Sequence, residues 1–404
     1  MEQSLFGIPI DFILFALTLI GIAAFHRYTL PVALAGLAAI TVYKLAFTGF
    51  KDGPGLGGLG LHLQHEWVVL ANLFLLLTGF ALLSRHFEES RVPDELPVIL
   101  PDNWTGAFAL LAIVFVLSGF LDNIAAALIG GTMARHVFKG RVHIGYLAAL
   151  VGASNSGGAG SVLGDTTTTM MWIAGISPLK VLDAYIPAAV ALMVFGIPAS
   201  RLQQSYSPII KQPPRRLQIA WVRLLIVGAI LIAAVLANVV TNIKFPAVLD
   251  QAPVLGLAVW AVILATSPLR RPDWSVMPET AKGTLFLLAL VLCASMMPVD
   301  KLPTPSWQTS LGLGFVSAVF DNIPLTALAL KQGGYDWGML AYAVGFGGTM
   351  TWFGSSAGVA LANMYPETKS VGLWLRHGWF VVVAYVLGFL VMLVILGWKP
   401  DAPD

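Results

Sequence analysis

The feature that most constrains this chain is a series of long apolar runs that carry almost no charge. A helix needs about 20 mainly apolar residues to cross the hydrocarbon core of a bilayer. Runs of suitable length and composition lie at 8–25, 30–48, 67–84, 180–197, 218–240, 252–268, 283–298 and 374–397. Charged residues make up 11% of the chain and its mean hydropathy is +0.80, whereas soluble domains carry about 25% charged residues. The sequence therefore predicts an all-α, polytopic membrane protein.

Composition also excludes several classes of function. The net charge of +2 is too small to suggest nucleic-acid binding, and the single cysteine, Cys293, excludes a disulfide framework. No Walker-type Gly-Lys-Ser/Thr sequence and no HExxH motif occurs. We therefore expect neither an ATPase nor an enzyme, no cofactor, and membrane lipid as the surrounding medium. The apolar run after MEQSLFGIPID lacks a preceding basic segment and is interpreted as a retained first span.

Four further apolar stretches are interrupted. Two of them, 106–134 and 308–331, have the length of two half-helices that meet at a tip inside the membrane. The other two, 142–175 and 338–364, contain breaks rich in Gly, Ser and Thr. A break at membrane depth leaves main-chain groups unpaired, which is tolerated only where protein or a polar cavity satisfies them. We therefore predict two re-entrant helical hairpins and two broken helices, with about 10–11 spans in all.

Basic residues give an orientation for these spans. With the two hairpins returning to the side from which they entered, and with the N-terminus outside, every Arg lies on the inner side and most Lys lie outside. Treating either hairpin as a complete span would invert the orientation of every span after it, and Arg and Lys would no longer separate between the two sides. We therefore expect a multi-pass protein of a bacterial inner membrane. The Gly-rich segment 51–65 is expected to be a loop or to lie at the membrane surface.

The two halves of the sequence are related. SGFLDNI at 118–124 recurs as SAVFDNI at 317–323, and each copy precedes a broken helix. Five predicted crossings separate the two hairpins, and an odd number places them on opposite membrane faces. Inverted repeats of this kind are common in secondary transporters, with the binding site near the midplane where the repeats meet. We predict an N-terminal repeat over 1–200, a cytoplasmic linker over 201–217 and a C-terminal repeat over 218–404.

Polar residues in these stretches are the candidate site. An aspartate at the membrane centre costs about 2.5–3.5 kcal/mol on insertion scales and is a functional candidate by default. Three aspartates lie deep, and hard cations favour the carboxylate, amide, hydroxyl and carbonyl oxygens around them. The candidate ion-binding residues are Asp122, Asn123, Ser154, Asn155, Gly164, Asp165, Thr166, Thr167, Asp321, Asn322, Ser355 and Ser356, of which Asp122, Asp165 and Asp321 are the candidate proton carriers.

The same residues also have a purely structural interpretation. Asp and Asn are good helix N-caps, so each Asp-Asn pair can simply cap the returning half of its hairpin. The hydroxyls of Thr166 to Thr169 can bond back to the preceding helical turn, and we expect one or two of them to face the site. A cap does not need a charge, which favours a functional role for the aspartates.

The order of these motifs resembles that of the ion-transporter superfamily. The motifs are LDNI at 121–124, a break ending in GDTTTT at 164–169, FDNIPLTA at 320–327 and a second break with GSSAG at 354–358. The superfamily contains NhaD-type sodium/proton antiporters, arsenite permeases, and citrate and dicarboxylate transporters, and GDTTTTMMW and SAVFDNIPLTA are most similar to the NhaD-type branch. The resemblance implies inverted repeats with a hairpin and a broken helix each, a scaffold that often forms a homodimer, and a transport domain that moves as an elevator.

Charge favours one branch of this superfamily. No Lys or Arg occurs in 106–134, 142–175, 308–330 or 338–364, the stretches that should line the site. Three carboxylates there repel a multivalent anion but suit a small cation, and their crowding makes protonation near neutral pH feasible. We therefore expect a secondary sodium/proton antiporter in which Na⁺, or Li⁺ in its place, competes with H⁺ for the aspartates. A cation-coupled carrier of citrate, dicarboxylates or arsenite-type oxyanions, and a channel or non-transporting membrane subunit, are the alternatives.

Overall fold

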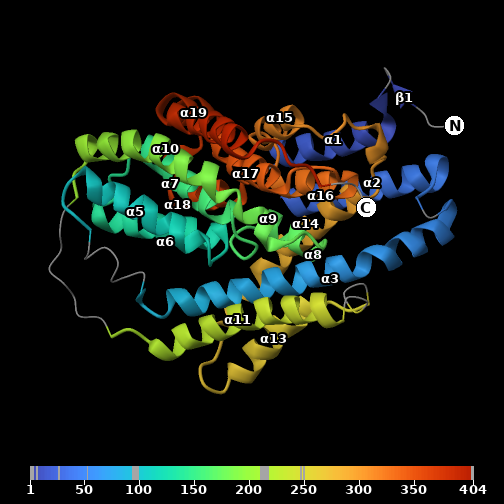
Figure 1. Cartoon of the computed structure of the whole chain (residues 1–404), viewed down its shortest axis with the longest axis horizontal. Helices are drawn as coiled ribbons and strands as arrows, with labels where there is room; N and C mark the ends of the chain where they lie inside the picture. The colour runs from blue at the N-terminus through green and yellow to red at the C-terminus, as the bar shows by residue number, and fades with distance from the viewer. Residues whose placement is uncertain are drawn as a thin grey trace. The chain divides into compact units, whose positions relative to one another are not determined.

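Helices account for nearly all of the regular structure (Figure 1). The structure is a computed structural model that describes residues 4–5, 8–25, 28–51, 53–92, 100–209, 218–245, 248 and 251–401. Two short strands, β1 (Ser4–Leu5) and β2 (Ile8–Pro9), pair antiparallel. Six helical segments of the described chain are long and apolar enough to cross a membrane, namely Thr29–Thr48, Gly55–Glu88, Pro178–Tyr206, Trp221–Thr241, Trp274–Ser295 and Val371–Leu396. The prediction of an all-α polytopic membrane protein is confirmed, while the number of spans stays a prediction.

The helices gather into two compact units, which we describe separately. Unit 1 comprises residues 1–82, 226–302 and 323–332, and unit 2 comprises 83–225, 303–322 and 333–404. Each unit takes segments from both halves of the sequence. This grouping by contact differs from the predicted division into two repeats, which therefore stays a prediction. Helix α10 continues to Tyr206, and residues 210–217 of the predicted linker lie outside the described residues.

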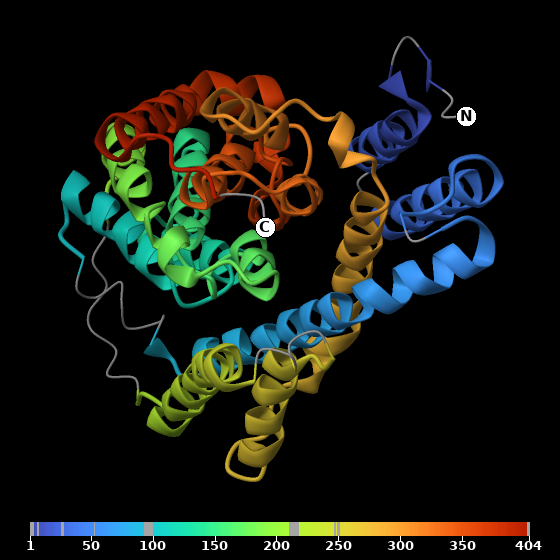
Figure 2. The ribbon, with the colours of Figure 1, turned by 45° about the vertical axis from the view of Figure 1, so that its right-hand side comes forward.

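Unit 1 consists mainly of apolar helices. Its elements are α1 (Ile10–Ala24), α2 (Thr29–Tyr43) with the π-helical turn η2 (Lys44–Thr48), most of α3 (Gly55–Glu88), most of α11 (Trp221–Lys244), α13 (Val254–Thr266), η4 (Trp274–Val276), α14 (Met277–Ser295), η5 (Val299–Lys301) and most of α16 (Asn322–Gln332). Helix α2 packs against both α1 and α14 (Figure 2). The broad exposed apolar surface of these helices, including Leu17, Val42 and Leu236, is what a lipid-facing surface requires.

The loop expected for the Gly-rich segment 51–65 is wrong for most of its length, because α3 already begins at Gly55, while the alternative place at the membrane surface stays a prediction. Glycine serves close packing here: a Cβ atom at Gly58 would lie 1.9 Å from the carbonyl oxygen of Gly53. Further along the same segment, His62 is buried, stacks on Phe50 and hydrogen-bonds to Ser295. These contacts hold the segment as helix despite the low helix propensity of glycine.

Unit 2 contains the interrupted stretches. Its elements are α5 (Trp104–Ser118), α6 (Asn123–Val137), α7 (Ile144–Ala159), α8 (Thr166–Ile173), α9 (Pro178–Leu182), α10 (Tyr185–Tyr206), α15 (Trp307–Ser317), α17 (Trp337–Gly347), η6 (Gly348–Met350), α18 (Ser356–Met364), η7 (Pro366–Thr368) and α19 (Val371–Leu396). Helices α7, α10 and α19 pack on one another, and α7 and α17 are buried over almost their whole length.

The interruptions fall where the sequence predicts them. The first hairpin stretch divides into α5 and α6, which pack against each other (Figure 1), and the second divides into α15 and α16. The two broken helices are α7 followed by α8, and α17 followed by α18. Side chains cap α6, α8 and α18, as expected for a break that must satisfy main-chain donors. The return of the hairpins to one membrane face, and the inverted topology, stay predictions.

Candidate functional site

Asp165 is the central charged group of the buried cluster in unit 2. It is 2% exposed and caps α8. Its Oδ2 accepts a hydrogen bond from the Thr167 hydroxyl at 2.8 Å, and its Oδ1 accepts from the Asn123 amide at 3.3 Å. Two neutral side chains therefore hold the carboxylate, and no Lys or Arg occurs in 106–134, 142–175, 308–330 or 338–364 to neutralise it. A buried carboxylate without a basic partner favours binding a cation or a proton.

Asp122 and Asp321 stand at the tips of the two hairpins. Asp122 is partly buried and caps α6, where its Oδ2 accepts from the Ile124 amide at 3.1 Å. Asp321 is also partly buried, and its Oδ2 accepts from the Ser356 hydroxyl at 3.1 Å. Asp165 interacts electrostatically with both of these aspartates. The cap predicted by the structural interpretation is thus present at Asp122, and Asp165 caps α8 in the same way, yet Asp165 also interacts electrostatically with both hairpin aspartates.

Asn155 links the two broken helices. Its side-chain amide donates to the hydroxyls of Thr349 and Ser355, each at 3.0 Å, and its Oδ1 accepts from the Asn123 amide at 3.3 Å. Asn155 is fully buried, and Ser355 in turn caps α18 by accepting from the Gly358 amide. One side chain of α7 therefore connects the first hairpin tip to the second break.

The remaining predicted site residues lie close to these groups. Ser154 donates its hydroxyl hydrogen bond to the Asn123 carbonyl at 2.5 Å. Gly164 and Thr166 are buried beside Asp165 in the break, and Asn322 is buried next to Asp321. Among the threonines, Thr167 faces the Asp165 carboxylate, whereas Thr168 and Thr169 donate to main-chain carbonyls.

The two halves make matching contacts around the breaks. A Cβ atom at Gly157 would lie 2.1 Å from the Phe115 carbonyl oxygen, and one at Gly347 would lie 2.3 Å from the Gly314 carbonyl oxygen. Both glycines allow a broken helix to approach the first helix of its hairpin. The hydroxyl of Ser161 donates to the Gly119 carbonyl at 2.7 Å.

The second half repeats this hydroxyl contact, because Thr351 donates to the Ala318 carbonyl at 2.5 Å. The carbonyl acceptors stand at equivalent positions just after the first helix of each hairpin. These paired contacts support a common origin for the two segments.

The pairing also exposes one asymmetry. Aligning Gly157-Gly158 with Gly347-Gly348 places Asn155 opposite Gly345 and Asp165 opposite Ser355. Asn155 reaches Ser355, while a Cβ atom at Gly345 would lie 3.0 Å from Oδ2 of Asp165. Ser355, the neutral cap of the second break, thus contacts the Asn155 amide, whereas Asp165, the charged cap of the first break, lies next to Gly345.

Sequence reasoning missed two residues of this site and one buried aspartate of unit 1. Thr349 and Gly345 belong to the second broken helix, and aligning the two breaks position by position would have pointed to Gly345. Asp11 is a further buried aspartate, 4% exposed, whose Oδ1 lies 3.3 Å from the Lys44 ammonium in unit 1. No signal in the sequence pairs these two residues, since they stand on different helices.

Comparison with known proteins shows similarity in sequence to sodium/proton antiporters. No known protein-family profile matches the chain. It is 26% identical to Sodium/proton antiporter 1 of Arabidopsis thaliana over 75% of this chain and 58% of that protein. It is 25% identical to the Na(+)/H(+) antiporter NhaD of Vibrio cholerae over 82% of this chain and 80% of that protein. The NhaD protein of Vibrio parahaemolyticus is 23% identical over 74% of this chain and 84% of its own length. The chain thus spans less than two thirds of the plant protein.

The helices, their apolar surfaces and the buried polar cluster define a polytopic α-helical membrane protein. Within that class, the chain is similar over most of its length to NhaD-type sodium/proton antiporters. The predicted resemblance to the NhaD-type branch is therefore confirmed.

Proposed function

We propose that the chain is a secondary active transporter that exchanges Na⁺, or Li⁺, for H⁺. The observation that carries this proposal is the buried Asp165 carboxylate, held by Asn123 and Thr167 in stretches that contain no Lys or Arg. A multivalent anion would meet three carboxylates there, whereas a small cation or a proton neutralises them. The antiporter names of the similar proteins support the same conclusion, and they describe transporters rather than enzymes.

Exchange follows from competition for one site. Asp165 and its neighbours offer carboxylate, amide and hydroxyl oxygens, which suit a hard cation. A carboxylate that holds either Na⁺ or H⁺, and not both, crosses the membrane neutralised by one or the other. Alternating access of such a site couples the two fluxes. The cluster formed by Asp122, Asp165, Asn155 and Ser355 belongs wholly to unit 2, so it can move as a single body.

The proposal also covers the membrane in which the protein lies, its orientation and its oligomeric state. We propose a bacterial inner membrane, an N-terminus on the outer side, and a homodimer formed through the scaffold that the family resemblance implies. The separation of Arg and Lys between the two sides supports the orientation. With an inward proton gradient, such a protein would extrude sodium.

Proteoliposomes loaded with a pH-sensitive dye test this function. Addition of external Na⁺ or Li⁺, but not K⁺, should make the lumen alkaline as protons leave. Asp165→Asn should abolish the response, and Asp122→Asn and Asp321→Asn should reduce it. Asp102→Asn, which alters an exposed aspartate before α5, is the matched control and should exchange like wild type. No response to any of the three cations from correctly folded wild-type protein would contradict the proposal and direct attention to organic-anion uptake.

A further inference from the structure

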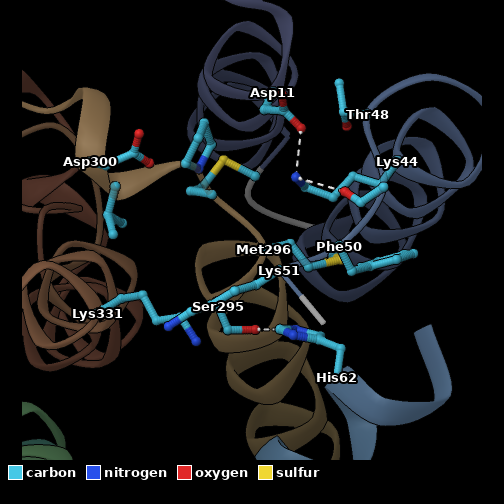
Figure 3. Close-up of a pocket in the computed structure, with 14 residues that line it drawn as sticks. Asp11, Lys44, Thr48, Phe50, Lys51, His62, Ser295, Met296, Asp300 and Lys331 are labelled. Atoms are coloured by element: carbon cyan, nitrogen blue, oxygen red, sulfur yellow. Dashed lines mark hydrogen bonds and ion pairs between the residues drawn. The ribbon is translucent and has the colours of Figure 1, made fainter. Parts of the chain in front are cut away.

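Unit 1 contains a cavity of about 370 Å³ that the exchange mechanism does not use (Figure 3). It is lined by residues of α1, of the π-helical turn η2 and the following loop, of α3, of α14 and the residues that follow it, and of α16. Three lysines (Lys44, Lys51 and Lys331) and two aspartates (Asp11 and Asp300) line it together with His62. A cavity of this kind, built from five parts of the fold, can bind a polar ligand.

The lysines differ in how far their charges are compensated. Lys44 is buried and paired with Asp11, with its ammonium 3.3 Å from Oδ1. Lys331 is paired with Glu66 at 3.1 Å. Lys51 is exposed and makes no hydrogen bond or ion pair within the described part of the chain. Asp300 is exposed. Lys51 is therefore the lysine of this cavity whose ammonium pairs with no carboxylate among the described residues.

Lys51 and Lys331 extend toward one another from opposite sides of the cavity (Figure 3). Two ammonium groups that converge repel each other unless an anion lies between them. Beside them, Nε2 of His62 and the hydroxyl of Ser295 form a buried hydrogen bond of 3.0 Å. The hydroxyl of Thr48 also lines the cavity and has no hydrogen-bond partner among the described residues. The Thr48 hydroxyl is thus a buried donor that remains available to a ligand with acceptor oxygens.

The position of the cavity at the ends of two helical segments able to cross a membrane indicates the source of such a ligand. Two of the helical segments able to cross a membrane end at its wall, Thr29–Thr48 and Trp274–Ser295. Lys51 follows the first of them by three residues. The ends of membrane-spanning helices lie at the level of the lipid head groups, where basic side chains attract lipid phosphates. Exposed apolar side chains such as Val42 and Phe47 lie on the adjoining turns of the same segment, where acyl chains would run.

We propose that the phosphate group of a phospholipid binds in this cavity between Lys51 and Lys331, beside the His62–Ser295 pair. The Lys44–Asp11 ion pair, which carries no net charge, also lines this cavity. The site is separate from the carboxylate cluster of unit 2, so it holds a structural or modulating lipid and not the transported ion.

Thermal unfolding of the whole protein in detergent micelles tests this site. Addition of dioleoyl phosphatidylglycerol should raise the melting temperature by about 2–4 °C, since a ligand that binds only the folded state stabilises it. A dioleoyl galactolipid with matched chains and no phosphate should not. The rise should shrink in Lys51→Gln and in Lys331→Gln and vanish in the double variant. Lys282→Gln, which alters an exposed lysine of α14 outside the cavity, is the matched control and should respond like wild type.

Three results would overturn the proposal. An equal rise with the galactolipid would show that phosphate is not recognised. An unchanged rise in the double variant would show that the lipid binds elsewhere. An equal rise with inorganic phosphate alone would assign the site to a soluble anion instead of a lipid. Sodium-dependent exchange by the double variant gives an independent readout, and it should persist because neither lysine belongs to the carboxylate cluster.

Discussion

Asn155 of α7 donates a 3.0 Å hydrogen bond to the hydroxyl of Ser355, the residue that caps α18, across 200 positions of sequence. The same amide group donates to Thr349 in the second break, and its oxygen accepts from Asn123 at the first hairpin tip. Three polar side chains from both halves of the sequence are therefore joined through one buried asparagine.

Asn155→Ala should destabilise the protein and slow exchange. It removes the shared partner of Thr349 and Ser355, and a buried polar group left without a partner costs about 1–3 kcal/mol. We expect a lower melting temperature and a lower maximal exchange rate in proteoliposomes. Asn363→Ala, at an exposed position of α18, should change neither quantity. A wild-type melting temperature for Asn155→Ala would show that this amide does not hold the breaks together.

Gly345→Ala should weaken sodium binding. The added methyl group would lie 3.0 Å from Oδ2 of Asp165, within the space that an ion bound to this carboxylate would share. We expect the half-saturating Na⁺ concentration to rise about tenfold, which corresponds to roughly 1.4 kcal/mol, with a smaller rise for the smaller Li⁺.

Gly372→Ala is the control for this change, since a Cβ atom there would meet nothing within 4 Å. Unchanged half-saturation for both ions in Gly345→Ala would place the ion away from this side of Asp165.

Gly157→Ala and Gly347→Ala should both impair folding, and to a similar degree. Each methyl group would overlap a main-chain carbonyl oxygen, at 2.1 Å and 2.3 Å respectively, which backbone movement alone can relieve. Size-exclusion profiles and melting temperatures of the purified variants measure the effect. Gly283→Ala in α14, where a Cβ atom meets nothing within 4 Å, should fold normally and gain up to about 1 kcal/mol. Normal stability of either break variant would contradict the close approach seen there.

The melting temperature should also depend on pH through Asp336. This residue caps α17, with Oδ1 accepting from the Met339 amide and Oδ2 from the Lys399 amide. Burial raises the pKa of its carboxyl above the usual range, and nearby Asp183 adds to the rise. A raised pKa means that the fold favours the protonated form, so this contribution to stability is present at low pH and is lost as pH rises through the folded-state pKa.

Asp336→Asn should remove this pH dependence while keeping the cap of α17, because the amide oxygen still accepts from Met339. The difference in melting temperature between wild type and Asp336→Asn should therefore shift in favour of wild type on going from pH 7.5 to pH 5. A difference that stays constant with pH would show that Asp336 titrates alike in the folded and unfolded protein.

Much of the architecture follows from local sequence. Long apolar runs have no stable alternative to membrane helices, because their main-chain groups must pair within the segment. The breaks were predictable as well, since Gly164-Asp165 and Gly354-Ser355 combine a residue that permits close approach with a good helix cap. Asp165 could be singled out because a charge in an apolar stretch is costly unless it serves a purpose. The helical start of α3 was not predictable in this way, since the close approach of Gly58 to Gly53 favours glycine where propensity disfavours it.

The sequence by itself thus determined the class of protein, the position of the breaks and the identity of the deep carboxylates. Tertiary structure alone decided which groups meet: Asn155 with Ser355, Gly345 with Asp165, and Lys51 with Lys331 over one cavity. The physical reason is the range over which each kind of interaction acts along the chain. Hydropathy, propensity and capping act within a few residues along the chain, whereas a hydrogen bond or a steric contact between distant helices depends on how those helices pack.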